Sequence, residues 1–204
     1  VYGNLTDMEL LGKFAKKNNL LVILDNAPAF ASKFKGQYPS HYGFSEIYSF
    51  HATKFFNCME GGTAVVNDRE IASTLQRSRD FGQFEKSRGD VDMPGMNAKM
   101  QEISALVGLK NLEKIDYILE KRTRNIKRYR DFFKGLESKG WITNMNVKES
   151  VFCSYLYFPI ILKEDALAFV QYMGDNGIAS RRYYTAVHTL KFYQGKYQEL
   201  DLSF

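Results

Sequence analysis

The sequence has little cysteine and lacks a long apolar run, and each absence excludes a class of protein. Two cysteines in 204 residues, Cys58 and Cys153, are too few for the disulfide framework of a small secreted domain. We therefore expect reduced thiols in a cytoplasmic protein. No apolar segment approaches the length of a membrane-spanning helix, so no membrane association is predicted. Residues 1–10 also lack the basic region and apolar stretch of a secretory signal.

A strong excess of one charge sign is also absent. The 28 Lys and Arg residues oppose 23 Asp and Glu residues, which leaves a net charge of +5. This excess suits an anionic small substrate but does not by itself indicate a nucleic-acid partner. Hydrophobic residues make up 45% of the chain, with 16 Phe and 13 Tyr, so a globular fold with a substantial core is predicted.

Helix and strand patterns alternate in the first part of the sequence. The tetrapeptide TDME forms a capping box in which Thr6 caps a helix and Glu9 reaches back. The apolar run LLVIL, residues 20–24, is typical of a strand buried on both faces of a parallel sheet. Further strands are predicted at residues 47–50 and 63–66, with a helix opening at 68–70. This alternation predicts an α/β fold.

The pattern changes twice in the second part of the sequence. Residues 81–94 are charged and contain glycine, which indicates a loop, and apolar residues then keep near-helical spacing over residues 103–133. Beyond this helix, strands are predicted at residues 154–161 and 178–184, and a helix is predicted at residues 166–173. We therefore predict a larger α/β domain over residues 1–134, which includes the long helix, and a smaller α+β domain over residues 135–204.

Asp25 and Lys54 follow predicted strands. Asp25 should stand at the carboxyl edge of the sheet, where open α/β sheets bind ligands, unless it only caps the next turn. Lys54 lies in YSFHATKFF, with no carboxylate within four positions on either side. Partial burial disfavours the ammonium form and would leave an amine able to form a Schiff base. The alternative is a surface lysine whose stem covers the aromatic rings.

Five segments in order carry a resemblance to a known family: VILDNAPAF, YSFHATKFFNCMEGGTAVVND, RDFG, PGMNAKMQEISALVGLKNLEKID and YYTAVH. They resemble the DegT/DnrJ/EryC1/StrS sugar aminotransferases, which are fold-type I pyridoxal-phosphate enzymes. The resemblance implies part of the large cofactor-binding domain, with a mostly parallel sheet, followed by the small C-terminal domain. It begins partway into the large domain, so we expect a fragment, a split gene product or an incomplete record.

The resemblance implies roles for four residues. Lys54 matches the catalytic lysine that forms a Schiff base with pyridoxal 5'-phosphate. Asp25 matches the aspartate that keeps the pyridine nitrogen protonated, so that the ring can accept electrons. Ser49 matches a hydroxyl that binds the phosphate. Asn97 matches an asparagine that reaches the phosphate from the neighbouring subunit, which implies a homodimer with shared active sites.

The sequence departs from the family pattern at some positions. Pro28 stands where the family usually has Gln or His against the cofactor ring, and it has no side-chain donor. Lys99 stands where many members have arginine. Members that dehydrate sugars carry histidine at the position of Lys54, so lysine there favours transamination. His51 is interpreted either as a packing or loop histidine or as a residue that contacts the sugar.

Two basic segments have alternative interpretations. In the C-terminal part, where the family often holds the nucleotide-sugar, the substrate-binding candidates are Arg181, Tyr183 and His188. Paired arginines suit a diphosphate and tyrosines stack on a base, while the alternative is a solvated strand edge. The basic run at residues 121–130 is either a nucleic-acid-binding stripe or a solvated helix face. The apolar residues interleaved with it favour the helix face.

The function that follows from the resemblance is transfer of an amino group to a nucleotide-linked keto-deoxysugar, in surface polysaccharide or antibiotic sugar biosynthesis. The resemblance implies glutamate as the amino donor. No metal site and no nucleic-acid partner are predicted. The alternative is a truncated, non-catalytic remnant with a partner-binding or regulatory role.

Overall fold

The computed structural model describes residues 1–83, 90–163 and 165–193, which fall into two compact units. The first unit comprises Val1–Gly135 and Asn144–Pro159, and the second comprises Leu136–Thr143 and Ile160–Phe204. The sequence placed every residue after 134 in the second domain. Residues 144–159 instead belong with the first unit, because strand β6 (Val151–Phe152) pairs with strand β2 (Lys33–Phe34) there.

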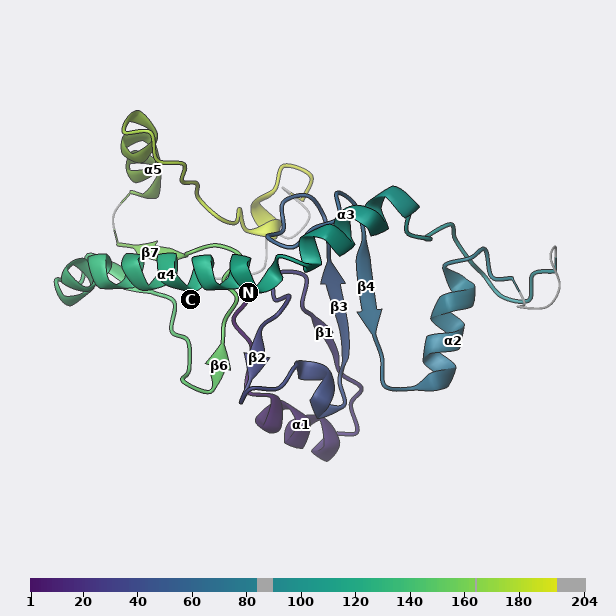
Figure 1. Cartoon of the computed structure of the whole chain (residues 1–204). Helices are drawn as coiled ribbons and strands as arrows, with labels where there is room; N and C mark the ends of the chain where they lie inside the picture. The colour runs from purple at the N-terminus through teal and green to yellow at the C-terminus, as the bar shows by residue number, and fades with distance from the viewer. Residues whose placement is uncertain (84–89, 164, 194–204) are drawn as a thin grey trace. The chain divides into compact units, whose positions relative to one another are not determined.

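The first unit contains a three-stranded sheet with the strand order β1–β3–β4 (Figure 1). Its strands are β1 (Ile23–Asp25), β3 (Ser45–Ser49) and β4 (Gly62–Val65). β1 runs parallel to β3, whereas β4 runs antiparallel to it. The predicted α/β class is confirmed, and the antiparallel β4 makes this sheet mixed.

The prediction that LLVIL is buried on both faces is wrong. Regular strand structure begins only at Ile23, and the side chains of Leu21 and Ile23 are 100% and 68% exposed. β1 is the terminal strand of its sheet, so in the described part of the chain it has a strand neighbour on one side only. An apolar run reveals what a strand is able to bury, but the neighbouring elements decide what is buried.

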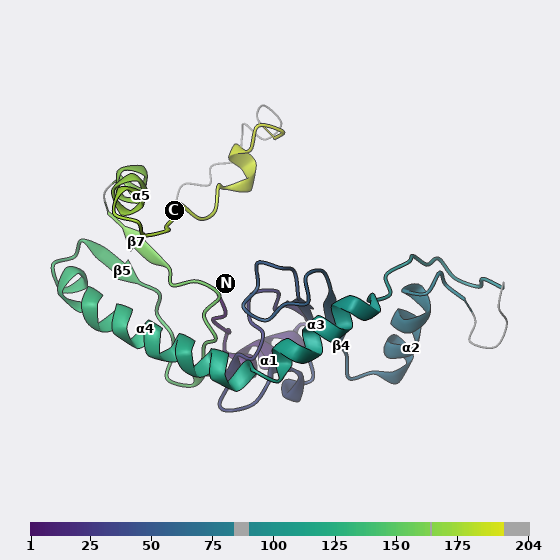
Figure 2. The ribbon, with the colours of Figure 1, turned by 45° about the horizontal axis from the view of Figure 1, so that its top comes forward.

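Two helices of the first unit begin at carboxylate caps. The Asp7 carboxylate caps α1 by accepting the Leu10 N–H at 3.0 Å, so the predicted cap at Thr6 is off by one residue. Asp68 caps α2 in the same way, and the helix that the sequence predicts to open at residues 68–70 is confirmed. The long helical pattern forms two helices with a short break between them (Figure 2). The bounds are α1 (Met8–Lys17), α2 (Arg69–Ser78), α3 (Glu102–Leu112) and α4 (Ile115–Ser138).

The core of the first unit lies where α1 meets the β2–β6 pair. Met8 of α1 and Phe34 of β2 are almost completely buried, together with Leu5, Phe44 and Val151. Burial of side chains of this size contributes about 1.5–3 kcal/mol each. The short helix η1 (Pro39–Tyr42) leads from this core into β3.

The basic run on α4 is partly structural, so its interpretation as a wholly solvated face is wrong. Arg122 donates hydrogen bonds to the carbonyl oxygens of Ser154 at 3.2 Å, Leu156 at 3.0 Å and Tyr155. Arg130 donates to the Tyr155 hydroxyl and to the Met145 carbonyl. Burial lowers the pKa of Arg122, although a guanidinium stays charged in proteins. These two arginines attach α4 to the segment that follows β6.

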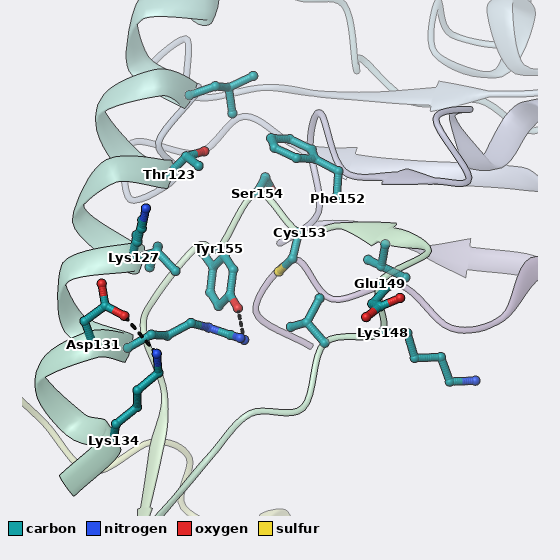
Figure 3. Close-up of a pocket in the computed structure, with 15 residues that line it drawn as sticks. Thr123, Lys127, Asp131, Lys134, Lys148, Glu149, Phe152, Cys153, Ser154 and Tyr155 are labelled. Carbon is teal, nitrogen blue, oxygen red and sulfur yellow. Dashed lines mark hydrogen bonds and ion pairs between the residues drawn. The ribbon is translucent and has the colours of Figure 1, made fainter. Parts of the chain in front are cut away.

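A hollow of about 490 Å³ lies beside this attachment, between α4 and residues 147–155 (Figure 3). Thr123, Lys127 and Lys134 line it from α4, opposite Glu149 and Cys153. Lys134 pairs with Asp131 at 3.2 Å on its own helix. Charged and apolar side chains thus line the hollow together.

The second unit contains a two-stranded sheet of β5 (Ile142–Asn144) and β7 (Ile160–Leu162), then α5 (Ala166–Asp175) and the short helix η2 (Val187–Thr189). The Asp165 carboxylate caps α5 by accepting the Leu167 N–H at 2.8 Å. The helix is confirmed, but residues 154–159 form no strand and neither do residues 178–184. Within the described ranges, no helix is long and apolar enough to cross a membrane.

Candidate active site

Asp25 and Ser49 end two neighbouring parallel strands. Asp25 is the last residue of β1 and Ser49 is the last residue of β3. The register pairs Asp25 with Ile47, two residues before Ser49. Both residues therefore stand at the carboxyl edge of the sheet, which is the ligand-binding edge of open α/β folds.

The backbone of Lys54 is held in the loop that connects β3 to β4. The loop is closed at its base, where Phe50 N–H donates to the Gly61 carbonyl at 2.8 Å and Cys58 N–H donates to the Phe50 carbonyl at 3.0 Å. Lys54 N–H donates to the His51 carbonyl at 2.9 Å, and the Lys54 carbonyl accepts from the Asn57 amide at 3.0 Å. Its backbone position is therefore fixed from both sides.

The Lys54 amine has no hydrogen-bond or ion-pair partner in the described ranges. The side chain is half-buried, and among the residues that the structure describes its Nζ makes no hydrogen bond or ion pair. Other lysines of the first unit, such as Lys35 and Lys99, have carboxylate partners at 2.6 Å. A fixed backbone with an amine that has no partner in the described ranges is compatible with a nucleophilic lysine.

Aromatic rings support the loop and connect it to the end of β1. Phe30, in the turn region after Asp25, stacks on Phe56 with ring centroids 4.3 Å apart. The same ring lies edge-on to Phe50 at 5.6 Å and to Tyr48 at 5.8 Å. The aromatics around Lys54 therefore pack on one another, and the alternative that the lysine stem covers them is not needed to bury Phe56.

The glycine pair after Glu60 allows two close backbone approaches. A Cβ at Gly61 would lie 2.6 Å from the Cys58 sulfur, and a Cβ at Gly62 would lie 2.7 Å from the Tyr48 carbonyl oxygen. Both distances are too short for real contacts, so only glycine fits without a shift of its neighbours. The EGG motif thus lets β4 pair with β3 directly after the Lys54 loop.

His51 is an exposed loop residue with an ordered set of polar neighbours. Its Nδ1 lies 2.9 Å from the Thr53 hydroxyl and 3.3 Å from the Thr53 N–H, which can only donate. Its Nε2 lies 3.4 Å from a Glu60 carboxylate oxygen. Nδ1 is therefore the acceptor, and a neutral ring carries its proton on Nε2, toward Glu60. The packing interpretation does not apply, whereas contact with a sugar stays a prediction.

The Asp25 carboxylate caps the following turn with one oxygen. Its Oδ1 accepts the Ala27 N–H at 3.1 Å, so the turn-capping alternative describes part of what this residue does. The side chain is exposed, and a carboxylate has further acceptor capacity. Pro28 lies in the same turn and contributes no side-chain donor there.

A buried carboxylate, Glu46 on β3, is a feature that our sequence interpretation missed. Glu46 is 1% exposed, and its Oε2 accepts from the Asn26 amide at 2.8 Å and from the Tyr48 hydroxyl. Burial, reinforced by the neighbouring Glu46, raises the pKa of Tyr48 well above its usual value. A usable signal was present, because Glu46 directly precedes the predicted strand at residues 47–50 and alternates with Tyr48, so a strand that began slightly earlier would place both on one face.

The segment around Asn97 lies beside the EGG motif of the same chain. A hollow of about 370 Å³ is lined by Glu60, Gly61 and Gly62 on one side and by residues 98–101 on the other. Lys99 pairs with Asp80 at 2.6 Å and lies over the Phe81 ring. Asn97 is exposed and pairs through its backbone with Asp80. Its contribution to a neighbouring subunit stays a prediction.

The C-terminal candidates lie in the second unit, Arg181 and Tyr183 on irregular backbone and His188 in a short helix. The Arg181 guanidinium lies 4.5 Å from the centre of the Tyr183 ring, and His188 belongs to η2. The predicted strand at this position is wrong, so the solvated strand edge is not the correct alternative. Substrate binding by Arg181, Tyr183 and His188 stays a prediction.

The first unit thus offers an unpaired amine, a carboxylate and a hydroxyl at or after one sheet edge, a donor set that fits pyridoxal phosphate. A Schiff-base cofactor needs a free lysine, its ring nitrogen needs a carboxylate and its phosphate needs donors. That Lys54, Asp25 and Ser49 supply these groups stays a prediction. No cluster of metal-ligating side chains occurs in the described ranges.

Comparisons with known proteins identify the family. The model of the DegT/DnrJ/EryC1/StrS aminotransferase family matches residues 1–204. The chain is 32% identical over 190 residues to dTDP-4-amino-4,6-dideoxy-D-glucose transaminase of Shigella dysenteriae, which covers 91% of this chain and 50% of that protein. It is 29% identical to GDP-perosamine synthase of Escherichia coli O157:H7, which covers 98% of this chain and 54% of that protein.

Solved structures show the same fold. DesV of S. venezuelae superposes with a TM-score of 0.87 at 22% identity, covering 96% of this chain and 52% of DesV. Helicobacter pylori PseC superposes with a TM-score of 0.86 at 24% identity, and the match covers 98% of this chain and 55% of PseC. The chain spans about half the length of the curated relatives it matches. With the family model matched over residues 1–204, the chain belongs to the DegT/DnrJ/EryC1/StrS aminotransferase family.

Proposed function

We propose that this chain carries the reactive lysine of a pyridoxal-phosphate-dependent sugar aminotransferase. The observation that supports this most directly is the half-buried, unpaired amine of Lys54 on a loop with a fixed backbone. The loop follows Ser49, at the sheet edge where Asp25 also ends its strand. Family membership agrees with this arrangement.

Three residues would hold the cofactor. Lys54 Nζ would bind it covalently, Asp25 would accept the proton of the ring nitrogen, and Ser49 would donate its hydroxyl hydrogen to the phosphate. When bound, pyridoxal phosphate supplies an electron sink for the carbon from which a proton is removed. Lys54 Nζ, once free, would take that proton from the amino donor and return one to the sugar. Its fixed backbone limits the motion to the side chain.

We propose a nucleotide-linked keto-deoxysugar as the acceptor and glutamate as the donor. The names of matched relatives include transaminases or synthases of dTDP-, GDP- and UDP-linked amino sugars. The structure of DesI in the presence of its TDP-sugar product matches at 26% identity with a TM-score of 0.81. Arg181, Tyr183 and His188 would bind the nucleotide or sugar, because guanidinium groups suit diphosphates and tyrosines suit bases.

We further propose a homodimer with shared sites, located in the cytoplasm, in which Asn97 of each subunit serves the other. The exposed position of Asn97 agrees with such a role. Mixing Lys54→Ala chains with Asn97→Ala chains tests it, since a mixed dimer would contain one site with both native residues. Recovery of activity above that of either variant alone is expected, and no recovery from folded mixed dimers contradicts shared sites.

Borohydride trapping tests the cofactor assignment. Incubation with pyridoxal phosphate followed by borohydride should fix the cofactor to Lys54, and peptide mapping should locate it there. The variant Lys54→Arg keeps the positive charge and should lose the adduct, whereas Lys35→Arg, which alters an ion-paired surface lysine, should keep it. Trapping mainly on another lysine would refute the assignment. A folded chain that traps no cofactor would favour the non-catalytic role.

A further inference from the structure

Three buried polar side chains form a network between β1 and β3. The Glu46 carboxylate is 1% exposed, and Asn26 and Tyr48 are also buried. Glu46 Oε2 accepts from Asn26 Nδ2 at 2.8 Å and from the Tyr48 hydroxyl. Burial raises the pKa of Tyr48, so its hydroxyl stays a donor over the whole working range of an enzyme. The proposed reaction assigns no role to any of these three residues.

Each end of the network is covalently next to a proposed cofactor ligand. Asn26 directly follows Asp25, and its backbone N–H donates to the Ile47 carbonyl at 2.9 Å. Its own carbonyl accepts from Ala29 N–H at 2.8 Å, which closes the turn after Asp25. Tyr48 directly precedes Ser49 at the end of β3. The network thus connects the residue after the ring carboxylate with the residue before the phosphate hydroxyl.

A buried carboxylate between β1 and β3 lowers stability, so stability does not by itself explain why Glu46 lies there. Transfer of a carboxylate from water to a protein interior is unfavourable, and well-packed apolar side chains of similar size are often at least as stable. Hydrogen bonds to a charged acceptor are stronger and more directional than apolar contacts. A network of this kind fixes the relative position of the groups it joins, which apolar packing does less strictly.

We propose that Glu46, with Asn26 and Tyr48, positions Asp25 and Ser49 for the cofactor. The inference rests on the proposed function and assigns these three residues a positioning role. Asn26 holds the turn that carries the ring carboxylate, and Tyr48 holds the strand end that carries the phosphate hydroxyl. Glu46 fixes the distance between this turn and this strand end, because it accepts hydrogen bonds from both Asn26 and Tyr48.

The exchange of donor and acceptor provides the test. Asn26→Asp removes the amide donor and places a second carboxylate against Glu46, where the two acceptors repel each other. Adding Glu46→Gln places an amide donor opposite the new carboxylate, and the Tyr48 hydroxyl, which contacts the same Oε2 position, can accept a hydrogen bond from this amide. Asn18→Asp makes the same chemical change at an exposed helix end and serves as the control. For each full chain, we would measure pyridoxal-phosphate affinity by titration at pH 8, the absorbance band of the bound cofactor, and thermal unfolding.

Asn26→Asp is expected to weaken cofactor affinity by roughly tenfold, the lower end of the effect of residues that orient metal ligands, and to shift the absorbance band. The double variant should regain most of the affinity, and Asn18→Asp should match the unchanged chain. Unaltered affinity and absorbance in Asn26→Asp, or equal losses in the single and double variants, would overturn the positioning role. If Asn26→Asp does not fold, Tyr48→Phe serves as the test instead. A loss of cofactor affinity smaller than roughly tenfold is then expected, and unchanged affinity would contradict the proposal.

The unchanged chain separates this inference from the proposed function. If borohydride traps the cofactor on Lys54 of the unchanged chain while the variants bind equally well, only the positioning role fails. If the unchanged, folded chain traps no cofactor, the proposed function fails and the positioning role fails with it.

Discussion

The thiol of Cys153 is buried, and its pKa is raised. The side chain is 8% exposed, and burial raises its pKa to about 11, from a usual value of 9.0. In the unfolded chain the same thiol ionises near its usual value. The folded state therefore holds this proton more tightly, and the resulting stabilisation is complete below pH 9 and is lost as the pH rises toward 11.

We predict that the free energy of unfolding decreases between pH 9 and 11, by up to roughly 2–3 kcal/mol from this thiol. Denaturant titrations at several pH values measure the decrease. Cys153→Ala removes the titrating group, so its decrease should be shallower. Tyr48 and Tyr155 add to the decrease in both proteins, because burial raises their pKa values too. Equal slopes for the unchanged chain and Cys153→Ala would contradict the prediction.

Substitution by alanine should change the free energy of unfolding in opposite directions at Gly62 and at Gly135. A Cβ at Gly62 would lie 2.7 Å from the Tyr48 carbonyl oxygen, a backbone atom of the paired strand, whereas a Cβ at Gly135 meets nothing within 4 Å. Gly62→Ala should lower the free energy of unfolding by about 1–3 kcal/mol, as overpacking does. Gly135→Ala, in α4, should raise it by up to about 1 kcal/mol, because alanine favours the helix. Chemical denaturation checks both signs, and a neutral Gly62→Ala would show that β3 and β4 can separate without cost.

At the scale of the element, Arg122 has the larger number of hydrogen bonds of the two arginines that attach α4. Arg122 donates to three carbonyl oxygens and lies over the Phe55 ring, with 4.7 Å to its centre. We predict that Arg122→Met, which keeps an apolar stem, lowers the free energy of unfolding by about 3 kcal/mol because the carbonyls lose charged donors. Arg128→Met, at an exposed position of the same helix, should change it by less than about 0.5 kcal/mol.

Denaturant unfolding of these two variants decides whether the basic run is one solvated face. Similar small effects would restore that interpretation and would contradict the structural role of Arg122. Since Phe55 follows Lys54 directly, Arg122→Met should also loosen the loop that carries the amine. Faster hydrogen exchange of the Lys54 and Cys58 amides, which donate hydrogen bonds inside this loop, is the expected sign.

At the scale of the molecule, features that depend on neighbouring residues in the sequence were predictable. The helix that opens at residues 68–70 and the helix at 166–173 depend on local hydrogen bonds and spacing, and the structure has both. The positions of Asp25 and Ser49 at one edge follow from strand pattern and parallel pairing. The antiparallel β4 and the return of residues 144–159 to the first unit depend on contacts distant in sequence, and no local pattern encodes them.

The exposed start of β1 has a consequence for the behaviour of the isolated chain. Leu21 is 100% exposed, next to a sheet edge that has no strand partner in the described ranges. Open edges with apolar side chains associate with other chains. We predict that the 204-residue chain forms species larger than a dimer as its concentration rises, and that Leu21→Lys reduces them because a charged edge resists pairing.

Size-exclusion chromatography with light scattering, over a range of concentrations, measures this association. Leu167→Lys is the matched control, since Leu167 is 62% exposed but lies on helix α5 rather than at a strand edge. If exposed apolar area alone drives association, both substitutions should reduce it similarly. If the open edge of β1 drives it, only Leu21→Lys should do so, and a chain that stays dimeric or smaller at high concentration would show that this edge is protected in solution.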